Sequence, residues 1–214
     1  MKVLNLYAGI GGNRKLWTDV EVTAVENVPE IAKIYQDFFP EDKVIVADAH
    51  RYLLEHYKEF DFIWSSPPCQ THSVTNHFLR GQGIERYPDM KLYEEIVFLR
   101  QWCKGKWVVE NVKGYYEPLI KPQESGRHYF WSNFYIPPIK VEYDIGTMNR
   151  EASKMTQRKA IIREAQIPEL ITLPGLKDFK LPNKRQILRN AVLPTIGLHV
   201  FRCAFKETQK ELIV

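Results

Sequence analysis

Short apolar runs alternate with segments of helical periodicity along the first two-thirds of the chain. Two segments place their apolar side chains on one helical face: PEIAKIYQDFF through Ile31, Ile34, Tyr35 and Phe38, and LYEEIVFLRQWC through Leu92, Ile96, Leu99 and Cys103. Five apolar runs predict strands, at Lys2 to Ala8, Val22 to Glu26, Lys43 to Ala47, Phe60 to Ser65 and Lys106 to Asn111. Strands that alternate with helices predict an α/β fold with a doubly wound, mostly parallel sheet.

Polar residues or glycines stand at or just beyond the carboxyl end of each predicted strand. In chain order they are Gly9 to Gly12, Glu26, Asp48, Cys69, and Glu110 with Asn111. In open parallel sheets, ligands bind outside the carboxyl ends of the strands. The sequence therefore predicts one site at this edge of the sheet.

The composition and the periodicity of the chain change after about residue 140. From Glu142 to Arg185 it is polar and weakly periodic, with nine Lys/Arg against six Asp/Glu. The segment QILRNAVLPTIGLHVFRCAF that follows is apolar and predicts a helix packing back on the sheet. We therefore divide the chain into a sheet-forming domain (1–140), a short insert (141–186) and a C-terminal segment (187–214).

Composition and charge exclude several classes of protein. The 214 residues are 44% hydrophobic and 26% charged, an ordinary balance for a soluble globular protein. No apolar run approaches the ~20 residues of a membrane span, and the N-terminus lacks a secretory signal, so we expect a cytoplasmic protein. The net charge of +4 is a mild indication of a polyanionic partner.

Cysteine usage argues against both disulfides and a metal. Cys69, Cys103 and Cys203 are odd in number and far apart, which favours a reducing compartment. Cys69 and His72 form a CxxH, but no second ligand pair stands at zinc spacing. We expect no metal site.

The glycine-rich turn YAGIGG and two carboxylates outline a slot for a nucleoside. Glycines after a strand let the backbone approach a ligand closely, although the dinucleotide pattern would need a glycine where Arg14 stands. Glu26 is placed to accept both hydroxyls of a ribose, and Asp48 could accept from an adenine amino group. Helix capping or solvation in a turn is the alternative for each carboxylate.

A cysteine directly after two prolines ends the fourth strand, in the stretch DFIWSSPPCQTHS. The prolines fix φ at two positions and so hold the thiol of Cys69 at the strand's carboxyl end. This stiff frame favours a nucleophile over a small buried apolar role, and Arg127 could supply the cation that favours a thiolate. Glu110 could exchange a proton with the substrate that the thiol attacks, the alternative being a solvated Glu110 beside a capping Asn111.

Five motifs follow one another in an order that carries a family resemblance: NLYAGIGGNRKLW, AVEN, PPCQTHS, ENVKG and RNAVLPTIG. They resemble the motifs of the cytosine-C5 DNA methyltransferases, from residue 3 to about 200. The resemblance implies the Rossmann-like fold of class I S-adenosylmethionine (AdoMet) dependent methyltransferases, with the insert at 141–186 as a short target recognition region. It also implies double-stranded DNA as the partner, DNA methylation of the kind used in restriction-modification, and a monomer.

The resemblance further implies a reaction and the residues that carry it. Cys69 would add to cytosine C6, Glu110 would act at N3, and Arg127 would bind the cytosine carbonyl oxygen. AdoMet would give its methyl group to C5 and leave as S-adenosylhomocysteine (AdoHcy). Its binding residues would be Tyr7, Ala8, Gly9, Gly11, Gly12, Glu26, Asn27, Asp48, Ala49, Pro68, Leu92 and Asn190.

A cytosine inside a duplex cannot reach such a pocket and must be flipped out. The segment THSVTNHFLRGQGIERYPDM resembles the mobile catalytic loop of the family, although an ordinary surface loop is the alternative. In it, Gln82 would fill the space vacated in the duplex, and Arg80 and Arg86 would bind phosphates.

Two departures from the family pattern leave other functions open. Ser125 replaces the middle arginine of the segment that contains Arg127, and Asn5 replaces the aspartate usual in the first motif. A tRNA cytosine-C5 methyltransferase and a catalytically silent DNA-binding relative both remain alternatives. A Cys-His hydrolase is a further one, although no feature assigns one of the six histidines to Cys69.

Overall fold

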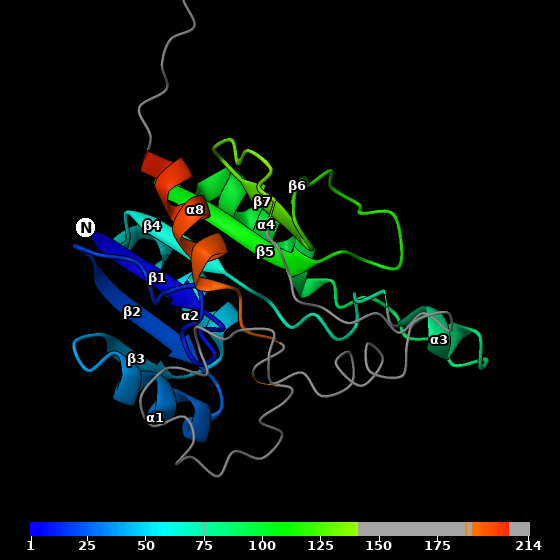
Figure 1. Cartoon of the computed structure of the whole chain (residues 1–214), viewed down its shortest axis with the longest axis horizontal. Helices are drawn as coiled ribbons and strands as arrows, with labels where there is room; N and C mark the ends of the chain where they lie inside the picture. The colour runs from blue at the N-terminus through cyan, green and yellow to red at the C-terminus, as the bar shows by residue number, and fades with distance from the viewer. Residues whose placement is uncertain (75, 141–186, 188–189, 206–214) are drawn as a thin grey trace, which may run out of the picture.

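One seven-stranded sheet forms the centre of the computed structural model, which describes residues 1–74, 76–140, 187 and 190–205 (Figure 1). The strand order is β3-β2-β1-β4-β5-β7-β6. The first five strands pair in parallel, whereas β7 runs antiparallel to both β5 and β6. The strands are β1 (Lys2–Leu6), β2 (Glu21–Glu26), β3 (Lys43–Val46), β4 (Phe62–Ser65), β5 (Lys106–Val112), β6 (Gln123–Ser125) and β7 (His128–Ser132).

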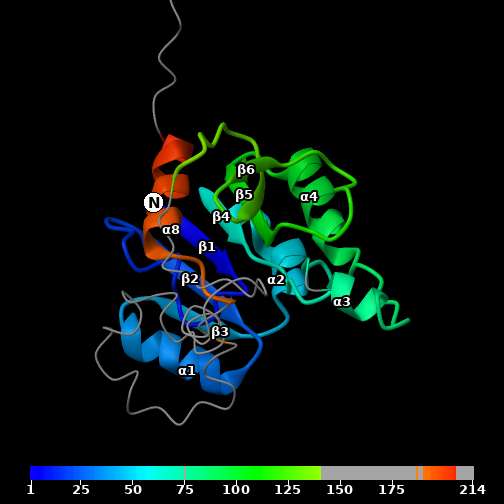
Figure 2. The ribbon, with the colours of Figure 1, turned by 45° about the vertical axis from the view of Figure 1, so that its right-hand side comes forward.

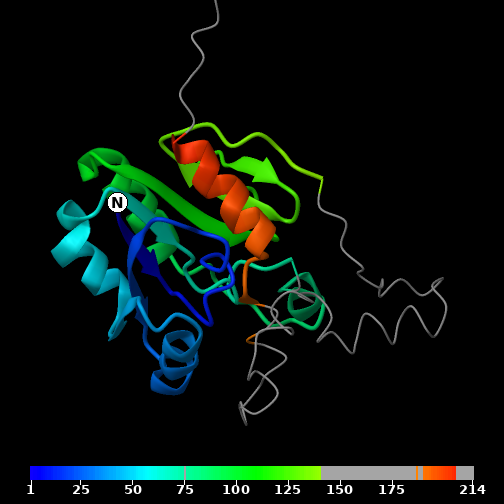
Figure 3. The same cartoon turned by 60° about the vertical axis from the view of Figure 1, so that its left-hand side comes forward.

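Helices cover both faces of this sheet. Side chains of α2 (Ala49–His56) and α4 (Lys91–Trp102) pack with Leu4 and Leu6, whereas α8 (Pro194–Phe205) packs with Val3, the residue that points to the other face. Helix α1 (Pro29–Phe38) packs on Ala24 of β2. Figure 3 shows α8 lying across the sheet face opposite α2. The expected doubly wound, mostly parallel α/β fold is confirmed.

Periodicity predicts five of the seven strands and the helices α1 and α4, each within a few residues of its bounds. It missed α2 and the antiparallel hairpin formed by β6 and β7. The short helices η1 (Tyr57–Glu59) and α3 (Asn76–Arg80) were also not predicted. Helix α3 lies in a long connection that carries it away from the sheet (Figures 1 and 2).

The apolar segment after the insert forms a helix, α8, that docks on the sheet as expected. Its Ile196 and Val200 are buried with Phe62 of β4, and the carbonyl of Gly197 accepts a hydrogen bond of 3.1 Å from the Trp17 indole. The insert, residues 141–186, and residues 206–214 lie outside the described residues, so the division of the chain into three parts stays a prediction.

No helix among the described residues is long and apolar enough to cross a membrane.

The contact of α8 with the loop after β1 leaves no room for a side chain at Gly197. A Cβ there would meet the Asn13 carbonyl oxygen at 2.2 Å and the Asn13 Cα at 2.7 Å, which are rigid backbone atoms. Alanine gains ~1 kcal/mol of helix propensity, but we expect Gly197→Ala to lower the free energy of unfolding by about 1–3 kcal/mol, because the helix must shift. Urea denaturation measures this change.

Gly81→Ala is the matched control for that measurement. A Cβ at Gly81 would lie 3.5 Å from its nearest neighbour, an ordinary contact. We expect a change within about 0.5 kcal/mol. Equal free energies of unfolding for the two variants would contradict the close packing at Gly197.

Candidate active site

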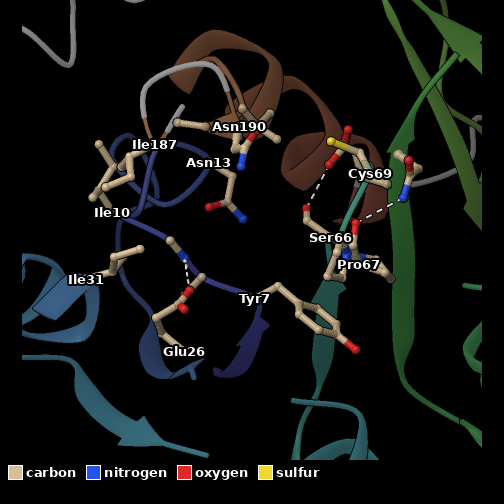
Figure 4. A pocket seen from close by; sticks show the side chains of 18 of the residues that line it. Tyr7, Ile10, Asn13, Glu26, Ile31, Ser66, Pro67, Cys69, Ile187 and Asn190 are labelled. Atoms are coloured by element: carbon tan, nitrogen blue, oxygen red, sulfur yellow. Dashed lines mark hydrogen bonds between the residues drawn. The ribbon is translucent and has the colours of Figure 1, made fainter. Parts of the chain in front are cut away.

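A cavity of about 270 Å³ opens at the carboxyl ends of β1, β2, β4 and β5, where the sequence predicts a site (Figure 4). This volume is near the lower end of the range for small-molecule sites, about 300–1,000 Å³. In Figure 4, Glu26 and Ile31 lie on one side of it and Ser66, Pro67 and Cys69 on the other. Its lining is Tyr7, Ala8, Gly9, Ile10, Gly12, Asn13, Glu26, Asn27, Val28, Ile31, Ser66, Pro67, Pro68, Cys69, Gln70, Glu110, Asn111, Val112, His128, Ile187, Asn190, Ala191 and Val192.

Glu26 ties the glycine turn after β1 to the end of β2. Its carboxylate accepts the backbone N–H of Gly9 at 2.9 Å and that of Val28 at 3.0 Å, and the residue is only 8% exposed. A carboxylate has about four lone-pair sites, so these two bonds leave room for two more. Glu26 thus presents unused acceptors to the cavity, next to apolar walls from Val28 and Ile31.

Four residues of the predicted cofactor set do not line the cavity. Gly11, at φ +79, packs under α1, where a Cβ would meet the Phe39 ring at 2.3 Å. Ala49 of α2 and Leu92 of α4 are buried in the hydrophobic core. Asp48 is the N-cap of α2 and accepts the Arg51 N–H at 2.8 Å, so the helix-capping alternative describes its place.

The other eight residues of that set do line the cavity. They are Tyr7, Ala8, Gly9, Gly12, Glu26, Asn27, Pro68 and Asn190. The geometry therefore brings together the glycine turn, the end of β2, the proline turn and the start of the C-terminal segment.

The turn that carries Cys69 is fixed by hydrogen bonds at both ends. The Asn111 side-chain amide donates to the carbonyl of Pro67 at 3.0 Å, which joins the end of β4 to β5. The carbonyl of Cys69 accepts from the backbone N–H groups of His72 and Ser73, both at 3.0 Å. Cys69 is partly buried and lines the cavity, so it is not packed away in the core.

The environment of Cys69 holds it as a thiol. Burial, together with the neighbouring carboxylate of Glu110, raises the pKa of Cys69 to about 11. The prediction that Arg127 could favour a thiolate is wrong, because the pKa of Cys69 is raised and Arg127 does not line the cavity. Burial disfavours the charged sulfur most, and the neighbouring Glu110 carboxylate adds to this effect.

Glu110 lies at the centre of a short chain of hydrogen bonds and is 5% exposed. The Trp64 indole donates to the hydroxyl of Ser66 at 2.8 Å, and that hydroxyl donates to Oε2 of Glu110 at 2.8 Å. His128 Nδ1 lies 2.6 Å from Oε1 of Glu110. Indole is only a donor, so the hydroxyl proton of Ser66 must point to Glu110.

His128 is a site residue that the sequence analysis missed. Arg127, predicted to reach the substrate, is exposed in the turn between β6 and β7 and does not line the cavity, whereas His128 does. Side chains alternate along a strand, so His128 shares the face of the buried Phe130, and Arg127 falls outside it. No local signal separates His128 from Arg127, because the pairing of β7 with β5 decides which of them faces Glu110.

Asn5 and Arg14, the two unusual residues of the glycine motif, have structural partners. Asn5 is fully buried, and its carbonyl oxygen accepts the amide of Asn13, a cavity residue, at 2.8 Å. Arg14 forms two hydrogen bonds with Asp42, at 2.9 and 3.0 Å. Both pairs fix the loop after β1 against its surroundings.

The connection that resembles a catalytic loop, residues 71–90, extends beyond the cavity. Gln82 and Arg86 are exposed, and the side chain of Arg80 lies outside the described residues. The Tyr115 hydroxyl donates to the Arg86 carbonyl at 2.6 Å, so the loop after β5 contacts this connection. Within the described ranges, no group of three or more His, Cys, Asp or Glu residues could hold a metal ion.

A family comparison decides the class of this protein. Residues 1–121 match the model of the C-5 cytosine-specific DNA methylase family. The chain belongs to this family. The matched residues contain the glycine turn, Glu26, Cys69 and Glu110, and the chain is a methyltransferase with a Rossmann-like fold.

Several solved structures are similar to parts of this family member. A DNMT2 mutant from Spodoptera frugiperda is 27% identical over 53% of this chain and 36% of that one, with a TM-score of 0.37. A putative DNA modification methyltransferase from an Escherichia coli prophage is 20% identical over 55% and 33%, with a TM-score of 0.37. The putative methyltransferase yhhF from Escherichia coli is 15% identical over 61% and 73%, with a TM-score of 0.41. No curated protein matches the chain.

The raised pKa of Cys69 predicts a steep pH dependence of its reactivity in this methylase family member. Because only the thiolate is nucleophilic, we expect the rate of alkylation by iodoacetamide to rise about tenfold per pH unit between pH 7 and 10, with a midpoint near pH 11. Mass spectrometry of the Cys69 peptide separates it from Cys103 and Cys203. In Glu110→Gln one cause of the shift is gone, so the midpoint should fall; a plateau below pH 9 in the unmodified chain would contradict this environment.

Proposed function

We propose that the chain is a DNA (cytosine-5-)-methyltransferase that moves a methyl group from AdoMet to C5 of a flipped-out cytosine, through a covalent bond between Cys69 and C6. One observation supports this most strongly: Cys69 and Glu110 line the same cavity as Glu26 and the glycine turn. A nucleophile, a proton carrier and a nucleoside-shaped slot thus share one space. The family match supports the same reaction class.

The residues on the Glu26 side fit AdoMet, the methyl donor that the family implies. The lone pairs of Glu26 left over by Gly9 and Val28 suit the two ribose hydroxyls. Val28 and Ile31 offer an apolar wall to the adenine. AdoMet, when bound, supplies the methyl group as an electrophile on a positively charged sulfur.

Cys69 and Glu110 make the cytosine ring reactive. The sulfur of Cys69 adds to C6 while N3 takes up a proton, which turns C5 into a nucleophilic carbon. The addition releases one thiol proton and consumes one proton at N3, so Glu110, the acidic neighbour of Cys69, can carry a proton from the first to the second. After methylation, a water molecule takes the C5 proton and the sulfur leaves C6 as a thiolate, while the N3 proton returns through Glu110 to the sulfur, which restores the ring and the thiol.

DNA binding in this proposal falls to the connection after Cys69 and to the insert. The connection 71–90 would act as the catalytic loop, with Gln82 in the vacated space of the duplex and Arg80 and Arg86 on phosphates. The insert 141–186 would be the target recognition region of a protein that acts as a monomer.

A test of this function uses duplex DNA that contains 5-fluorocytosine. Fluorine at C5 cannot leave as a proton, so the adduct should persist after methyl transfer. We expect a complex that survives denaturing electrophoresis in the presence of AdoMet and is lost in Cys69→Ser. Labelled AdoMet with unmodified duplex DNA should give 5-methylcytosine, and a higher rate on tRNA would instead assign the same chemistry to RNA.

The neighbours Arg127 and His128 provide a second test. The contact between His128 and Glu110 predicts that His128→Leu lowers kcat by about tenfold or more, because the proton carrier loses a partner. Arg127→Leu, in the exposed turn, should lower kcat less. Steady-state kinetics on duplex DNA compares the two variants. A larger loss of kcat in Arg127→Leu than in His128→Leu would assign the substrate contact to Arg127.

A further inference from the structure

Glu95 is a carboxylate with no exposed surface, on helix α4, and the proposed reaction gives it no part. Its Oε1 accepts the hydroxyl of Tyr7 at 2.6 Å and lies 3.1 Å from His50 Nδ1. Its Oε2 accepts the hydroxyl of Ser65 at 2.5 Å. A buried carboxylate is stable only when hydrogen-bonded, and here three groups share that task.

The three partners come from three different segments, two of which end at the cavity. Tyr7 follows β1, Ser65 is the last residue of β4, and His50 lies in the first turn of α2. The next residues along the chain belong to the site: Gly9 binds Glu26, and Ser66 binds Glu110. One side chain therefore joins the cofactor turn (Tyr7–Gly9) to the thiol turn (Ser66–Cys69).

The backbone of Tyr7 needs such an anchor. Its φ of +54 lies in the left-handed region, which a bulky side chain adopts only when its surroundings hold it there. Burial, with Glu95 beside it, raises the pKa of Tyr7 far above its ordinary value, so the phenol keeps its proton and remains a donor. Hydrogen bonds to an ionised acceptor are among the strongest in proteins.

The side chain of Tyr7 does not point at a ligand. In Figure 4 its ring runs away from Glu26 and Asn13, past Ser66 and Pro67. Its hydroxyl donates a hydrogen bond to Glu95. The contribution of Tyr7 to the site is therefore its backbone, which opens the turn to Gly9.

We propose that Glu95 is a positioning residue for methyl transfer: by binding Tyr7 and Ser65 at once, it sets the cofactor turn against the thiol turn. This inference rests on the proposed function. Reacting atoms must be held about 3–3.5 Å apart, and a misplacement of about 1 Å costs about a hundredfold in rate. Glu95 acts through the two turns and touches neither substrate nor cofactor.

Glu95→Gln tests the proposal, with Glu94→Gln as its matched control. Glutamine keeps the shape of the side chain, but it has one acceptor oxygen in place of two and carries no charge. It therefore cannot accept the hydrogen bonds of both hydroxyls as the carboxylate does. Glu94 is the adjacent residue on α4, with a side chain 62% exposed and only a 3.6 Å contact to His50. We expect Glu95→Gln to lower kcat by about a hundredfold and the affinity for AdoHcy, measured by calorimetry, by about tenfold; Glu94→Gln should change each by less than about twofold.

Two smaller changes separate the two hydrogen bonds that Glu95 accepts, one from Tyr7 and one from Ser65. Tyr7→Phe removes the hydroxyl on the cofactor side and should lower AdoHcy affinity without changing the alkylation rate of Cys69 at pH 9. Ser65→Ala removes the hydroxyl on the thiol side and should change that rate without changing AdoHcy affinity. If both act through Glu95, adding either to Glu95→Gln produces no further loss. These variants keep the test decisive if Glu95→Gln does not fold.

The outcomes separate this proposal from the function on which it rests. Wild-type levels of AdoHcy affinity, kcat and Cys69 reactivity in Glu95→Gln, with only a lower melting temperature, would leave Glu95 a purely structural residue and overturn the inference. The absence of 5-methylcytosine with wild-type protein would overturn the proposed function instead. In that case AdoHcy affinity and Cys69 alkylation still report whether Glu95 couples the two turns.

Discussion

The parallel alignment of β1, β4 and β5 is the constraint on which the candidate site depends. Leu6 pairs with Ser65, and Ser65 pairs with Val109, so β1 and β4 end level with the residue before Glu110, while β5 continues to Val112. This register lets the glycine turn, the thiol turn and Glu110 meet although they are far apart in sequence. The hydrogen bond from Asn111 to the carbonyl of Pro67 extends the link between β4 and β5 beyond the last ladder pair. The prolines then need only fix the direction in which Cys69 leaves the sheet.

Three buried carboxylates at this edge of the sheet take donors of different kinds, and the kinds match different tasks. Glu26 accepts two backbone N–H groups, which cannot rotate away and so fix the turn. Glu95 accepts two side-chain hydroxyls and faces an imidazole, all inside the protein. Glu110 accepts one hydroxyl and faces the imidazole of His128 at the cavity wall. Of these three, only Glu110 thus combines a place at the cavity with an imidazole partner.

The sequence predicts those parts of the fold that depend on local pattern. Apolar runs found the parallel strands because central strands are buried on both faces. Helix α2 was not predicted because its polar sequence, AHRYLLEH, buries only Ala49 and Leu53. Glu26 and Asp48 have the same pattern at strand ends, but Glu26 lines the cavity whereas Asp48 caps α2 and does not line it. Arg127 and His128 differ by one position, and only the register of the hairpin, a tertiary fact, decides which of them faces Glu110. Glu95 gave no signal because its partners lie on three other segments.

The carboxylate of Glu110, which together with burial raises the pKa of Cys69, can also accept the proton that the thiol must lose. With a pKa near 11, roughly one thiol in 10⁴ is ionised at neutral pH. A thiolate formed beside an ionised Glu110 would place two negative charges in a buried space. If the thiol proton passes to Glu110, the number of charges in the cavity stays the same, and the repulsion from Glu110, the smaller of the two causes of the raised pKa after burial, disappears. In the proposed reaction, a cytosine in the cavity would take this proton at N3. The sulfur would then become nucleophilic as its proton leaves, without a second negative charge in the cavity.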